Sequence, residues 1–545
     1  MLRILFFQTL LFLGACACSV GCRESSDSPS QPQPRPSPPS FDRNASEIDE
    51  GATDPIADDL RKAKLINRMR PQVEKFCGGC HVTPPPQDST AAEWVAQVDQ
   101  MFMFYHSSGR TDLPLPDRNA VLEFFQVQAA EHPTLTAGIE SYPPSPVAFD
   151  HVNVTGAGHR PPGVTNIQWL DLGLRDSPAL VYCDIGTGTV MAHWPGDPDQ
   201  PTVRLGTVFQ PVHVEACDLD QDGNQDLIIA DIGEFNANDS DLGQVVWLRR
   251  RAPTDESDLD AHFDKTVLLD GLSRVADVRP GDFDNDGDID LLVAEFGWRQ
   301  TGRIFLMVNE GSANPGVPQF SIREIDDRHG PIQVPTLDFN RDGHLDFIAL
   351  IGQEHECVEV FLNDGKGSFT PERLWTASNP GYGSSGIELV DLDGDGDTDI
   401  LYTNGDSFDR GAKPHHSVQW LENTGTLPFE HHLLCSMPGA MVAKAGDFDG
   451  DGDLDVIAAA LLVGDDLEEV NSVDSSSIAL LIQDAPGHFQ PTQVESKSHQ
   501  HLTLEVGDFN RDGKVDAAVG NFVRHGPSQS ATPDLILLVN EAEDE

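Results

Sequence analysis

Basic side chains are scarce in this sequence. Its 545 residues include 35 lysines and arginines against 89 aspartates and glutamates, which gives a formal net charge of −54. Nucleic acids and anionic membrane surfaces attract lysine and arginine, so this balance argues against sequence-independent binding to either of them. A carboxylate excess of this size calls for counter-ions, and many of the aspartates are concentrated in short segments.

Common catalytic motifs are also missing. The sequence contains no H-E-x-x-H, G-x-S-x-G or P-loop segment. Four cysteines, Cys183, Cys217, Cys357 and Cys435, lie in strand-like segments, where buried free thiols are the favoured interpretation and a disulfide stays open. We therefore name no catalytic residue, and enzymatic activity is left open.

Long hydrophobic runs are confined to the N-terminus. The run Ile4–Leu13 follows a single arginine and is too short to span a bilayer, so residues 1–21 are predicted to be a secretory signal. The residues before Cys16 and Cys22 resemble the lipobox of bacterial lipoproteins, which predicts an exported protein, periplasmic or at the cell surface, held at a membrane by a lipid on one of these cysteines. An ordinary cleaved signal peptide is the alternative. Residues 22–56 are rich in serine, proline and glutamine and are expected to form a disordered linker.

A C-x-x-C-H segment follows this linker. Cys77 and Cys80 are three positions apart, a spacing that lets two thiols reach the two vinyl groups of one porphyrin, and His81 then presents its imidazole to the iron. A zinc half-site is disfavoured because no second cysteine or histidine pair follows at normal spacing. A redox disulfide is disfavoured because the βαβ context of a thioredoxin-like motif is absent. The predicted cofactor is one covalently attached haem c.

The surrounding residues favour helices. Apolar residues recur at helical spacing over residues 58–76, with a kink or a break into two helices expected at Pro71. Thr90 and Glu93 form a capping box for a helix that runs to about Tyr105, and Asp117 can cap a last helix over residues 118–131. This pattern resembles the cytochrome c family over residues 57–132, and we assign residues 57–140 to a small all-α domain.

The sixth ligand of a haem iron is left open by the sequence. Met101 lies seven residues after Trp94, a W-x6-M arrangement that is similar to that of related exported cytochromes. Met103 and His106 are nearby alternatives, and Met101 also shares a helical face with apolar residues, as a core residue would. A Met/His ligand pair would suit electron transfer, whereas an open position would permit ligand binding.

The rest of the chain repeats one acidic motif, D-x-[DN]-x-D-G-x-x-D, six times at intervals of 53 to 64 residues. We call these six segments the acidic loops and name each by its first aspartate. Their oxygen-rich positions 1, 3, 5, 7 and 9 are the predicted metal-site residues: Asp218, Asp220, Asp222, Asn224 and Asp226; Asp282, Asp284, Asp286, Asp288 and Asp290; Asp338, Asn340, Asp342, His344 and Asp346; Asp391, Asp393, Asp395, Asp397 and Asp399; Asp447, Asp449, Asp451, Asp453 and Asp455; Asp508, Asn510, Asp512, Lys514 and Asp516.

This motif has the chemistry of a calcium loop. Alternate residues of a tight turn can direct hard oxygen ligands at one centre, the glycine at position 6 permits the turn, and position 7 can offer its backbone oxygen. An EF-hand would need glutamate at position 12, where all six loops have an apolar or aromatic residue inside a strand. We therefore expect up to six structural Ca²⁺ ions, with solvated acidic turns as the alternative. A degenerate copy at Asp171–Asp176 lacks the glycine, and no calcium is expected there.

Each acidic loop leads into a buried strand, and about four short strands fit into each repeat. With the degenerate copy there are seven units, which predicts a mainly β fold: a seven-bladed β-propeller over residues 148–541. A strand at Phe149–Val154 is expected to pair with Asp534–Asn540 and close the ring. The repeats resemble the FG-GAP/VCBS family, whose blades occur in integrin α-subunit propellers, and this resemblance implies calcium-bound blades that bind a partner.

Three functions follow from this organisation. The first is electron transfer by an exported haem protein whose propeller docks a redox partner or an extracellular ligand. The second is a binding or adhesion protein in which haem is secondary, and the third is an oxidoreductase that uses the propeller as its substrate domain. We favour the first because the haem is the only redox chemistry visible in the sequence, and we expect a monomer.

Overall fold

The computed structural model of the protein describes residues 55–130, 139–156, 160–197, 201–251, 262–311, 316–408, 411–463, 470, 473–523 and 532–541. The predicted signal peptide, the two candidate lipidation sites Cys16 and Cys22, and nearly all of the predicted linker lie outside these ranges. Among the described helices, none combines the length and the hydropathy that crossing a membrane requires.

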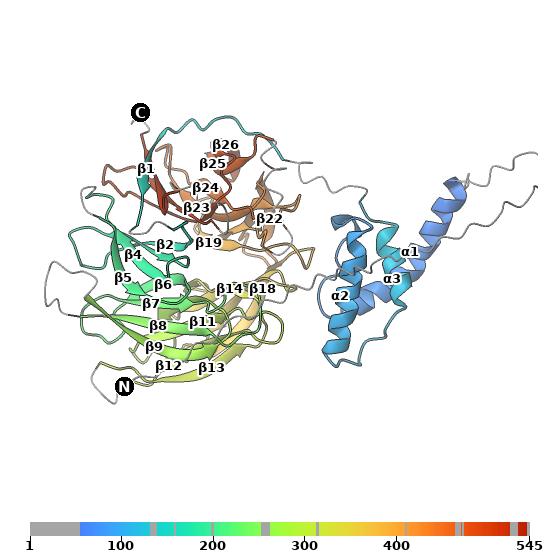
Figure 1. The fold of residues 1–545 in the computed structure, drawn as a ribbon, viewed down its shortest axis with the longest axis horizontal. Helices are drawn as coiled ribbons and strands as arrows, with labels where there is room; N and C mark the ends of the chain where they lie inside the picture. The colour runs from blue at the N-terminus through green and yellow to red at the C-terminus, as the bar shows by residue number, and fades with distance from the viewer. Residues whose placement is uncertain are drawn as a thin grey trace, which may run out of the picture. The chain divides into compact units, whose positions relative to one another are not determined.

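The N-terminal part of the described chain is helical (Figure 1). Its elements are α1 (Pro55–Cys77), the short 3-10 helix η1 (Pro86–Asp88), α2 (Glu93–Ser107) and α3 (Arg118–Gln126). The capping box at α2 is confirmed, because the Thr90 backbone N–H donates to Glu93 Oε2 at 2.7 Å and the Glu93 N–H donates to Thr90 Oγ1 at 3.2 Å. The Asp117 cap is confirmed too, since Asp117 Oδ1 accepts from the Ala120 N–H at 2.8 Å. The last helix ends at Gln126, five residues before the predicted end.

Of the kink or break predicted at Pro71, the break into two helices does not occur. α1 is one continuous helix of 23 residues with Pro71 inside it. A proline inside a helix costs about 3 kcal/mol because it removes a backbone donor and crowds the preceding turn. Here the helix buries Met69, Val73 and Phe76 on both sides of the proline, and burying side chains of this size contributes about 1.5–3 kcal/mol each, which outweighs the local cost.

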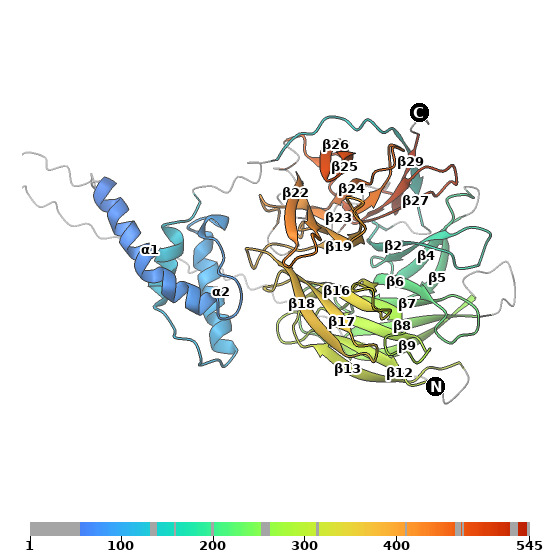
Figure 2. The same cartoon turned by 180° about the vertical axis from the view of Figure 1, so that it is seen from behind.

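The described strands form seven antiparallel sheets arranged as a propeller (Figures 1 and 2). In chain order, blade 1 contains β2 (Val164–Leu170), β3 (Ala179–Asp184), β4 (Thr189–His193) and β5 (Val203–Thr207); blade 2 contains β6 (Pro211–Cys217), β7 (Asp226–Asp231), β8 (Gly243–Arg250) and β9 (Phe263–Leu272); blade 3 contains β10 (Val275–Gly281), β11 (Asp290–Glu295), β12 (Arg303–Asn309) and β13 (Phe320–Asp326). Blade 4 contains the split first strand β14 (Pro331–Gln333) and β15 (Thr336–Leu337), then β16 (Asp346–Ile351), β17 (Cys357–Asn363) and β18 (Phe369–Thr376). Blade 5 contains β19 (Gly386–Val390), β20 (Asp399–Thr403), β21 (Ser417–Glu422) and β22 (Glu430–Ser436); blade 6 contains β23 (Ala440–Gly446), β24 (Asp455–Ala460), β25 (Ser476–Ala485) and β26 (His488–Ser496).

The two ends of the propeller sequence close the ring in blade 7. This blade combines β27 (His501–Gly507), β28 (Asp516–Asn521) and β29 (Leu535–Asn540) with β1 (Phe149–Val154) from the start of the propeller. β1 pairs antiparallel with β29 along its whole length, from Phe149 opposite Asn540 to Val154 opposite Leu535. The predicted closure is confirmed, and it pairs a strand edge that would otherwise be open.

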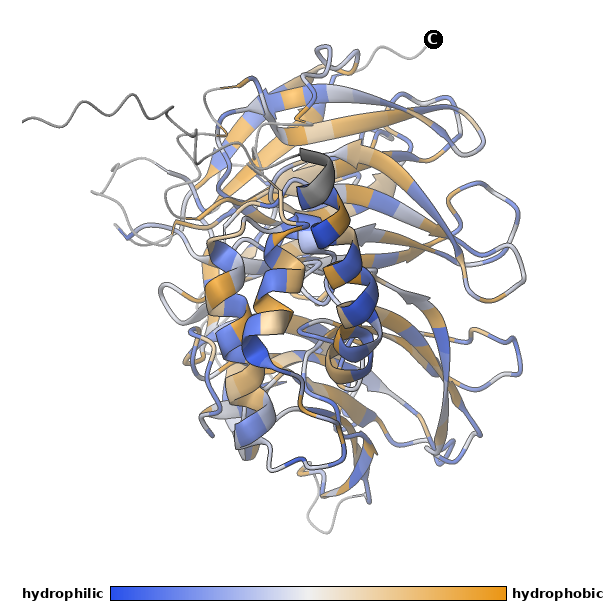
Figure 3. Cartoon of the chain, turned by 90° about the vertical axis from the view of Figure 1, so that its right-hand side faces the viewer, coloured by the Kyte–Doolittle hydropathy of each residue, from blue (hydrophilic) through white to orange (hydrophobic). Residues whose placement is uncertain are grey.

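The hydrophobic core of the propeller lies between neighbouring blades. Seven clusters of buried side chains each combine residues of two adjacent sheets, in order around the ring and including the contact of blade 7 with blade 1. The second strand of every blade is buried at all of its residues. Hydrophobic colours follow the strands and hydrophilic colours follow the loops (Figure 3). A strand covered on both faces needs a continuous apolar run, which is the pattern that follows each acidic loop.

Candidate functional site

Each acidic loop connects the first strand of a blade to its second strand, in blades 2 to 7. The position-1 aspartate organises the turn, because its carboxylate accepts the backbone N–H of the position-6 glycine in all six loops, at 2.8 to 3.1 Å. The position-5 aspartate accepts the backbone N–H of position 7 in all six, at 2.8 to 3.0 Å. The loops are thus curled around their own carboxylates before any ligand is considered.

Two positions of each loop have a left-handed backbone, and sequence reasoning found only one of them. The position-6 glycines have φ between 89° and 97°, as the motif predicts. Position 4 is also left-handed, with φ of 57° at Gln221, 60° at Asn285 and Arg341, 64° at Arg511, 74° at Gly394 and 81° at Gly450. The signal was present in the sequence, because glycine and asparagine occur at three of these six positions and both tolerate this conformation better than other residues.

The position-9 aspartate joins each loop to the third strand of its blade. In the Asp282 loop, Asp290 Oδ2 accepts the Phe283 N–H at 3.1 Å and Oδ1 accepts the Asn309 N–H at 2.8 Å. Asp346, Asp399, Asp455 and Asp516 repeat both hydrogen bonds. Asp226 accepts instead from the Arg250 backbone and the Trp247 indole. The predicted role of this residue was to close a cation site, and its hydrogen bonds give it a second, structural role.

Burial makes these position-9 carboxylates costly to ionise. Burial raises the pKa of Asp226, Asp290, Asp399 and Asp455 to about 6, and the position-3 carboxylate of the same loop adds to the shift in all four. Burial also raises the pKa of Asp284 and of Asp449 at position 3, with further repulsion from neighbouring aspartates. A bound cation would remove this cost, because an opposite charge nearby favours the ionised form of a carboxylate.

Four loops bring three carboxylates to one point. Asp282, Asp284 and Asp290 each offer an oxygen within 4.8 Å of the other two, and Asp391, Asp393 and Asp399 do the same. The other two groups are Asp447, Asp449 and Asp455, and Asp218, Asp220 and Asp222. Oδ1 of Asp282, Asp284 and Asp391 is buried without a hydrogen-bond partner among the described residues. Buried oxygens that no donor satisfies fit a hard cation such as Ca²⁺.

The Asp218 loop differs from the other three in this group. The guanidinium of Arg249 forms an ion pair with Asp220, the position-3 aspartate. The pKa of Asp220 is nevertheless raised, because burial and the neighbouring aspartates outweigh the arginine. A protein cation therefore already neutralises part of the charge that this loop would offer to an ion.

The Asp338 and Asp508 loops have asparagine at position 3 and do not form such a cluster among the described residues. Asn340 Nδ2 donates to Asp342 Oδ2 at 2.9 Å, and Asn510 Nδ2 donates to Asp512 Oδ2 at 2.8 Å. The amide at position 3 thus donates a hydrogen bond to the carboxylate at position 5. In the other loops an aspartate stands at position 3, and it repels that carboxylate. These two loops place the predicted oxygen ligands in the same turn, but with three aspartates where the Asp282, Asp391 and Asp447 loops have five.

Side chains at positions 4 and 7 connect successive loops. Gln221 Nε2 donates to the Gly287 carbonyl of the next loop at 2.7 Å, and Asn285 Nδ2 contacts His344 Nδ1 at 3.1 Å. Arg341 donates to the Gly396 carbonyl and to Asp397. The Asp391 and Asp447 loops have glycine at position 4, Gly394 and Gly450, and therefore no side chain there that could reach the next loop. The position-7 side chains predicted as possible ligands are thus used, where a donor is available, to join neighbouring blades.

The third strands make a second connection between blades. Asn363 Nδ2 donates to the Phe283 carbonyl at 2.8 Å, and Asn540 Nδ2 donates to the Phe448 carbonyl at 2.8 Å. Gln483 Nε2 donates to the Leu392 carbonyl at 3.2 Å. Each acceptor is the position-2 residue of the acidic loop in the preceding blade. No role of Asn363, Gln483 or Asn540 was predicted from the sequence.

The degenerate loop of blade 1 is joined to the last acidic loop of the ring. Asp171 Oδ1 accepts the Gly173 N–H at 2.9 Å, and no group of three ligand atoms forms here in the described part of the chain. Arg511 of the last acidic loop donates to the Asp176 carbonyl at 2.9 Å. A position-4 side chain of blade 7 therefore contacts blade 1 as well, although blade 1 has no complete acidic loop.

The C-x-x-C-H segment begins at the last residue of α1. Cys77 is buried and Cys80 is exposed, and both are free thiols. His81 Nδ1 donates to the Val82 carbonyl at 2.7 Å. This bond leaves Nε2 as the lone-pair nitrogen, which is the arrangement that metal-ligating histidines commonly have. Arg110 donates to the Gly79 carbonyl at 2.9 Å and to Cys80 Sγ at 3.0 Å.

Burial argues against a redox-active cysteine pair at this segment. Burial, and secondarily the neighbouring Cys80, raises the pKa of the Cys77 thiol to about 12. Catalytic C-x-x-C pairs need a thiol of lowered pKa, because the thiolate is the nucleophile. No metal-ligand group of three side chains includes Cys77, Cys80 or His81 among the described residues, so a zinc site finds no support either.

The candidates for a sixth ligand differ in their surroundings. Met101 is half-buried and packs against the core of the helical module, whereas the Met103 side chain is 58% exposed and His106 is exposed. Val82, the residue after His81, is exposed.

The inner strands of the blades enclose a cavity of about 660 Å³. Every blade contributes its first strand to the lining, and buried ion pairs project from these strands. Arg279 pairs with Glu215 at 2.5 Å and with Asp277 at 3.0 Å, while Lys444 lies 3.5 Å from Glu388. Burial opposes the ionisation of Asp277, but the charge of Arg279 overcomes it and lowers the pKa of that carboxyl. The size of the cavity falls in the range of small-molecule sites.

Two further sequence features are clarified by the structure. Cys183, Cys217, Cys357 and Cys435 are free thiols, and burial raises the pKa of Cys357 and of Cys435 to about 12. The segment Gly381–Gly386 matches the G-x-G-x-x-G pattern, which sequence reasoning overlooked. It leads into β19 of the propeller and is not followed by a helix, so it lacks the context of a dinucleotide site.

Comparison with known proteins bears on the propeller. Residues 282–349 and 338–402 each match the model of an FG-GAP-like repeat. Each match begins at the first aspartate of an acidic loop and runs into the second strand of the next blade. No curated protein matches the chain. The propeller of this protein therefore contains FG-GAP-like repeats, which lie in blades 3 to 5.

Proposed function

We propose that the protein is an exported electron-transfer protein in which a c-type haem module is joined to a calcium-stabilised propeller that docks a partner. The redox part of the proposal rests on the hydrogen bond of the His81 ring. Its Nδ1 is held by the Val82 carbonyl, so Nε2 is left to bind iron, beside two unpaired cysteines at the required spacing. Cys77 and Cys80 would hold the porphyrin, and Met101 is the favoured sixth ligand.

The haem would supply one-electron redox chemistry when bound. The chain's own contribution is to fix the ring of His81 and to keep Cys77 buried at the end of α1, packed in the apolar core of the helices. Arg110, which Asp112 holds through two hydrogen bonds, would fix the backbone of the segment through the Gly79 carbonyl and contact Cys80.

Docking is the role supported for the propeller. FG-GAP-like repeats in blades 3 to 5 and the closed ring of blades provide a rigid scaffold whose loops can contact a partner. Calcium would occupy the acidic loops, with the tightest binding expected in those that hold five aspartates. Export fits this proposal, because loops with a calcium Kd of about 10⁻⁴–10⁻³ M are filled at the calcium concentrations found outside cells. Attachment to a membrane through Cys16 or Cys22 belongs to the same proposal.

A spectrum tests the haem assignment most simply. The full chain is produced in the periplasm together with a haem-maturation system, and the purified protein is examined by a reduced-minus-oxidised spectrum and by haem staining after denaturation. We expect covalently bound haem in the wild type and none in Cys77→Ser/Cys80→Ser. Cys435→Ser, which removes a buried thiol outside the motif, should keep its haem. Wild-type protein without covalent haem under these conditions would refute the redox part of the proposal.

A second variant assigns the sixth ligand. Methionine ligation gives oxidised haem c a weak absorption band near the red end of the spectrum, and Met101→Ala should abolish it. Met103→Ala is the matched control, since its side chain is exposed on the same helix. Loss of the band in Met103→Ala and its retention in Met101→Ala would reverse the assignment.

The cavity inside the ring favours one alternative, an oxidoreductase with its substrate in the propeller. Its volume and its charged lining, with Arg279 and Lys444 among buried carboxylates, suit a small polar molecule. Turnover with an artificial electron acceptor distinguishes this function from electron transfer alone. We expect no turnover in the absence of a partner, and substrate-dependent reduction of the haem would favour the enzyme instead.

A further inference from the structure

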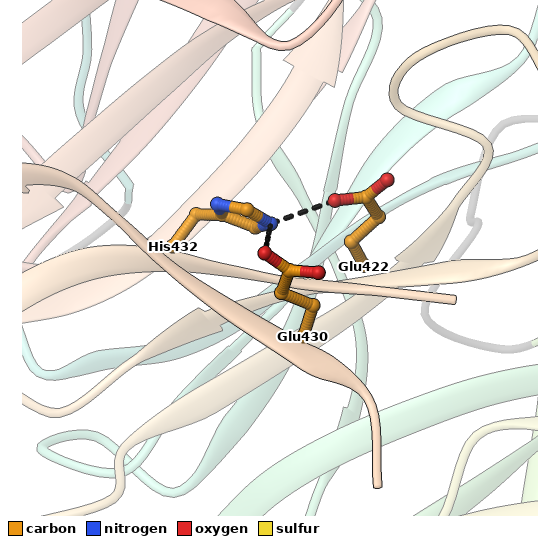
Figure 4. A group of neighbouring side chains, drawn as sticks. All are labelled: Glu422, Glu430 and His432. Atoms are coloured by element: carbon orange, nitrogen blue, oxygen red, sulfur yellow. Dashed lines mark hydrogen bonds and ion pairs between the residues drawn. The ribbon is translucent and has the colours of Figure 1, made fainter. Parts of the chain in front are cut away.

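A histidine and two glutamates meet on the outer strands of blade 5 (Figure 4). Glu422 ends β21, and Glu430 and His432 lie on β22, so none of the three belongs to an acidic loop. His432 Nε2 lies 2.7 Å from Glu422 Oε2 and 3.9 Å from Glu430 Oε1. One donor atom of each residue lies within 4.8 Å of the other two.

The strand register explains why these side chains share one face. Glu422 lies directly opposite Glu430, and Trp420 lies directly opposite His432. Residues two apart on a strand point to the same side, so the four side chains form a square patch. The Trp420 ring is buried and lies 4.8 Å from the His432 ring at 31°, which limits the rotation of the imidazole.

The charges of this patch are unfavourable without a cation. Like charges directly opposite each other on antiparallel strands destabilise the pair. Among the described residues, the only ion-pair partner of either glutamate is His432. The three side chains are also accessible, with 25% of Glu422, 33% of His432 and 66% of Glu430 exposed. A cation from solution can therefore reach the space between them.

We propose that Glu422, Glu430 and His432 bind a divalent transition-metal ion of the zinc class. The imidazole distinguishes this site from the acidic loops, because nitrogen ligands suit Zn²⁺, Cu²⁺ and Ni²⁺, whereas Ca²⁺ takes oxygens. Two ligand atoms at 2.0–2.1 Å from one tetrahedral zinc ion lie about 3.3 Å apart. The two observed separations from His432 Nε2, 2.7 and 3.9 Å, bracket this value, so small rotations of the glutamates would admit the ion.

Three protein ligands leave the fourth position of a tetrahedral zinc ion for water or an external ligand. Structural zinc sites are closed by four protein ligands and are usually buried, and this site is neither. It therefore suits an exchangeable ion, or an ion whose last ligand comes from a molecule docked on the outer edge of blade 5. The alternative for the same geometry is a protonated His432 that pairs with both glutamates and binds no metal.

Zinc binding by calorimetry distinguishes the two. All proteins are full-length, carry Cys77→Ser/Cys80→Ser so that these thiols do not compete, and are kept in excess calcium so that the acidic loops are filled. Titration with ZnCl₂ should reveal one site that His432→Ala weakens at least tenfold, since even the loss of an outer partner of a metal ligand costs about 10–100-fold in affinity. Glu430→Gln should weaken it as well.

The matched control is His488→Ala. His488 is an exposed histidine that pairs with a single carboxylate, Asp484, and its loss should leave the zinc isotherm unchanged. Co²⁺ in place of zinc gives a second readout, a visible absorption band that should vanish in His432→Ala while the circular dichroism of the fold is kept. An unchanged isotherm in His432→Ala, or a wild type without a zinc site, would overturn the proposal in favour of the protonated histidine.

Discussion

The Asp282 loop and the Asp338 loop, in neighbouring blades, have the same backbone and different charge. Both curl around a position-1 aspartate, both have a left-handed residue at position 4, and both are held by a buried aspartate at position 9. The Asp282 loop gathers carboxylates at positions 1, 3 and 9, whereas Asn340 of the Asp338 loop donates to Asp342 and relieves the repulsion. The repeat therefore encodes the turn, and position 3 sets how strongly the turn needs a cation.

Of all the changes to the loops, removal of calcium should lower the stability of the protein most. A ligand that binds only the folded state stabilises it by RT ln(1 + [L]/Kd), about 2.7 kcal/mol for each site when the calcium concentration is 100 times Kd. Because several loops contribute, we expect excess chelator to lower the melting temperature strongly. Calorimetry with calcium and with chelator measures this, and equal melting temperatures would mean that the loops are solvated acidic turns.

The position-9 aspartate should matter equally in both kinds of loop. Asp290→Ala leaves two backbone N–H groups without their acceptor, and Asp346→Ala leaves the same two and a third, from Asn340, at 3.4 Å; a buried unsatisfied donor costs about 1–3 kcal/mol. We expect each variant to lose about 2–6 kcal/mol in urea unfolding. The measurement is made in chelator, so that lost metal binding does not contribute.

Asp286→Ala is the control for these two variants, since its side chain is exposed and accepts one backbone hydrogen bond. It should cost clearly less than Asp290→Ala. If Asp286→Ala and Asp290→Ala cost the same, position 9 would have no special structural role.

Exchange of the position-3 residue should convert one kind of loop into the other. Asn340→Asp adds a carboxylate to the Asp338 loop and should tighten its calcium binding, while Asp393→Asn should weaken binding in the Asp391 loop, because ligand charge tunes the affinity of such sites. We expect about tenfold in each direction, or about 1.4 kcal/mol. Calcium titration followed by calorimetry measures the change, and a shift of the same sign in both variants would contradict the role given to position 3.

The left-handed position 4 should give the smallest effect. An alanine at Gly394 meets no atom within 4 Å, so its only cost is the φ of 74°, about 1 kcal/mol. Gly381→Ala, in the same blade and without a positive φ, is the matched control and should change the unfolding free energy by less. Equal losses in urea unfolding would show that the backbone conformation of position 4 is not what selects glycine there.

Much of the propeller could be predicted from the sequence, because each blade repeats the same local signals. The acidic loop and the buried strand after it are visible as patterns within a few residues. The repeats then predict a ring, and the ring predicts that Phe149–Val154 pairs with the last strand. The hydrogen bonds of Gln221 to the next loop and of Asn363 to the preceding blade were not predicted. They join residues 66 and 80 positions apart, and only the stacking of blades decides which donors meet which carbonyls.

The N-terminal helices α1, α2 and α3 show where local sequence patterns are not enough. Their capping residues were predicted correctly because capping is local. At Pro71 the sequence left a kink or a break open, and the break does not occur because the burial of Met69, Val73 and Phe76 overrides the local cost of proline. The site on blade 5 was missed for a related reason. Glu430 and His432 are close in the sequence, but Glu422 joins them only through the strand register of β21 and β22.

Loops with the same backbone are expected to differ in calcium affinity. Calcium titration of protein from which a chelator has removed all calcium tests this central claim most directly. We expect a tight class of three ions in the Asp282, Asp391 and Asp447 loops, and weaker binding in the Asp338 and Asp508 loops and in the Asp218 loop, where Arg249 already pairs with Asp220. Six equivalent ions, or none, would contradict this.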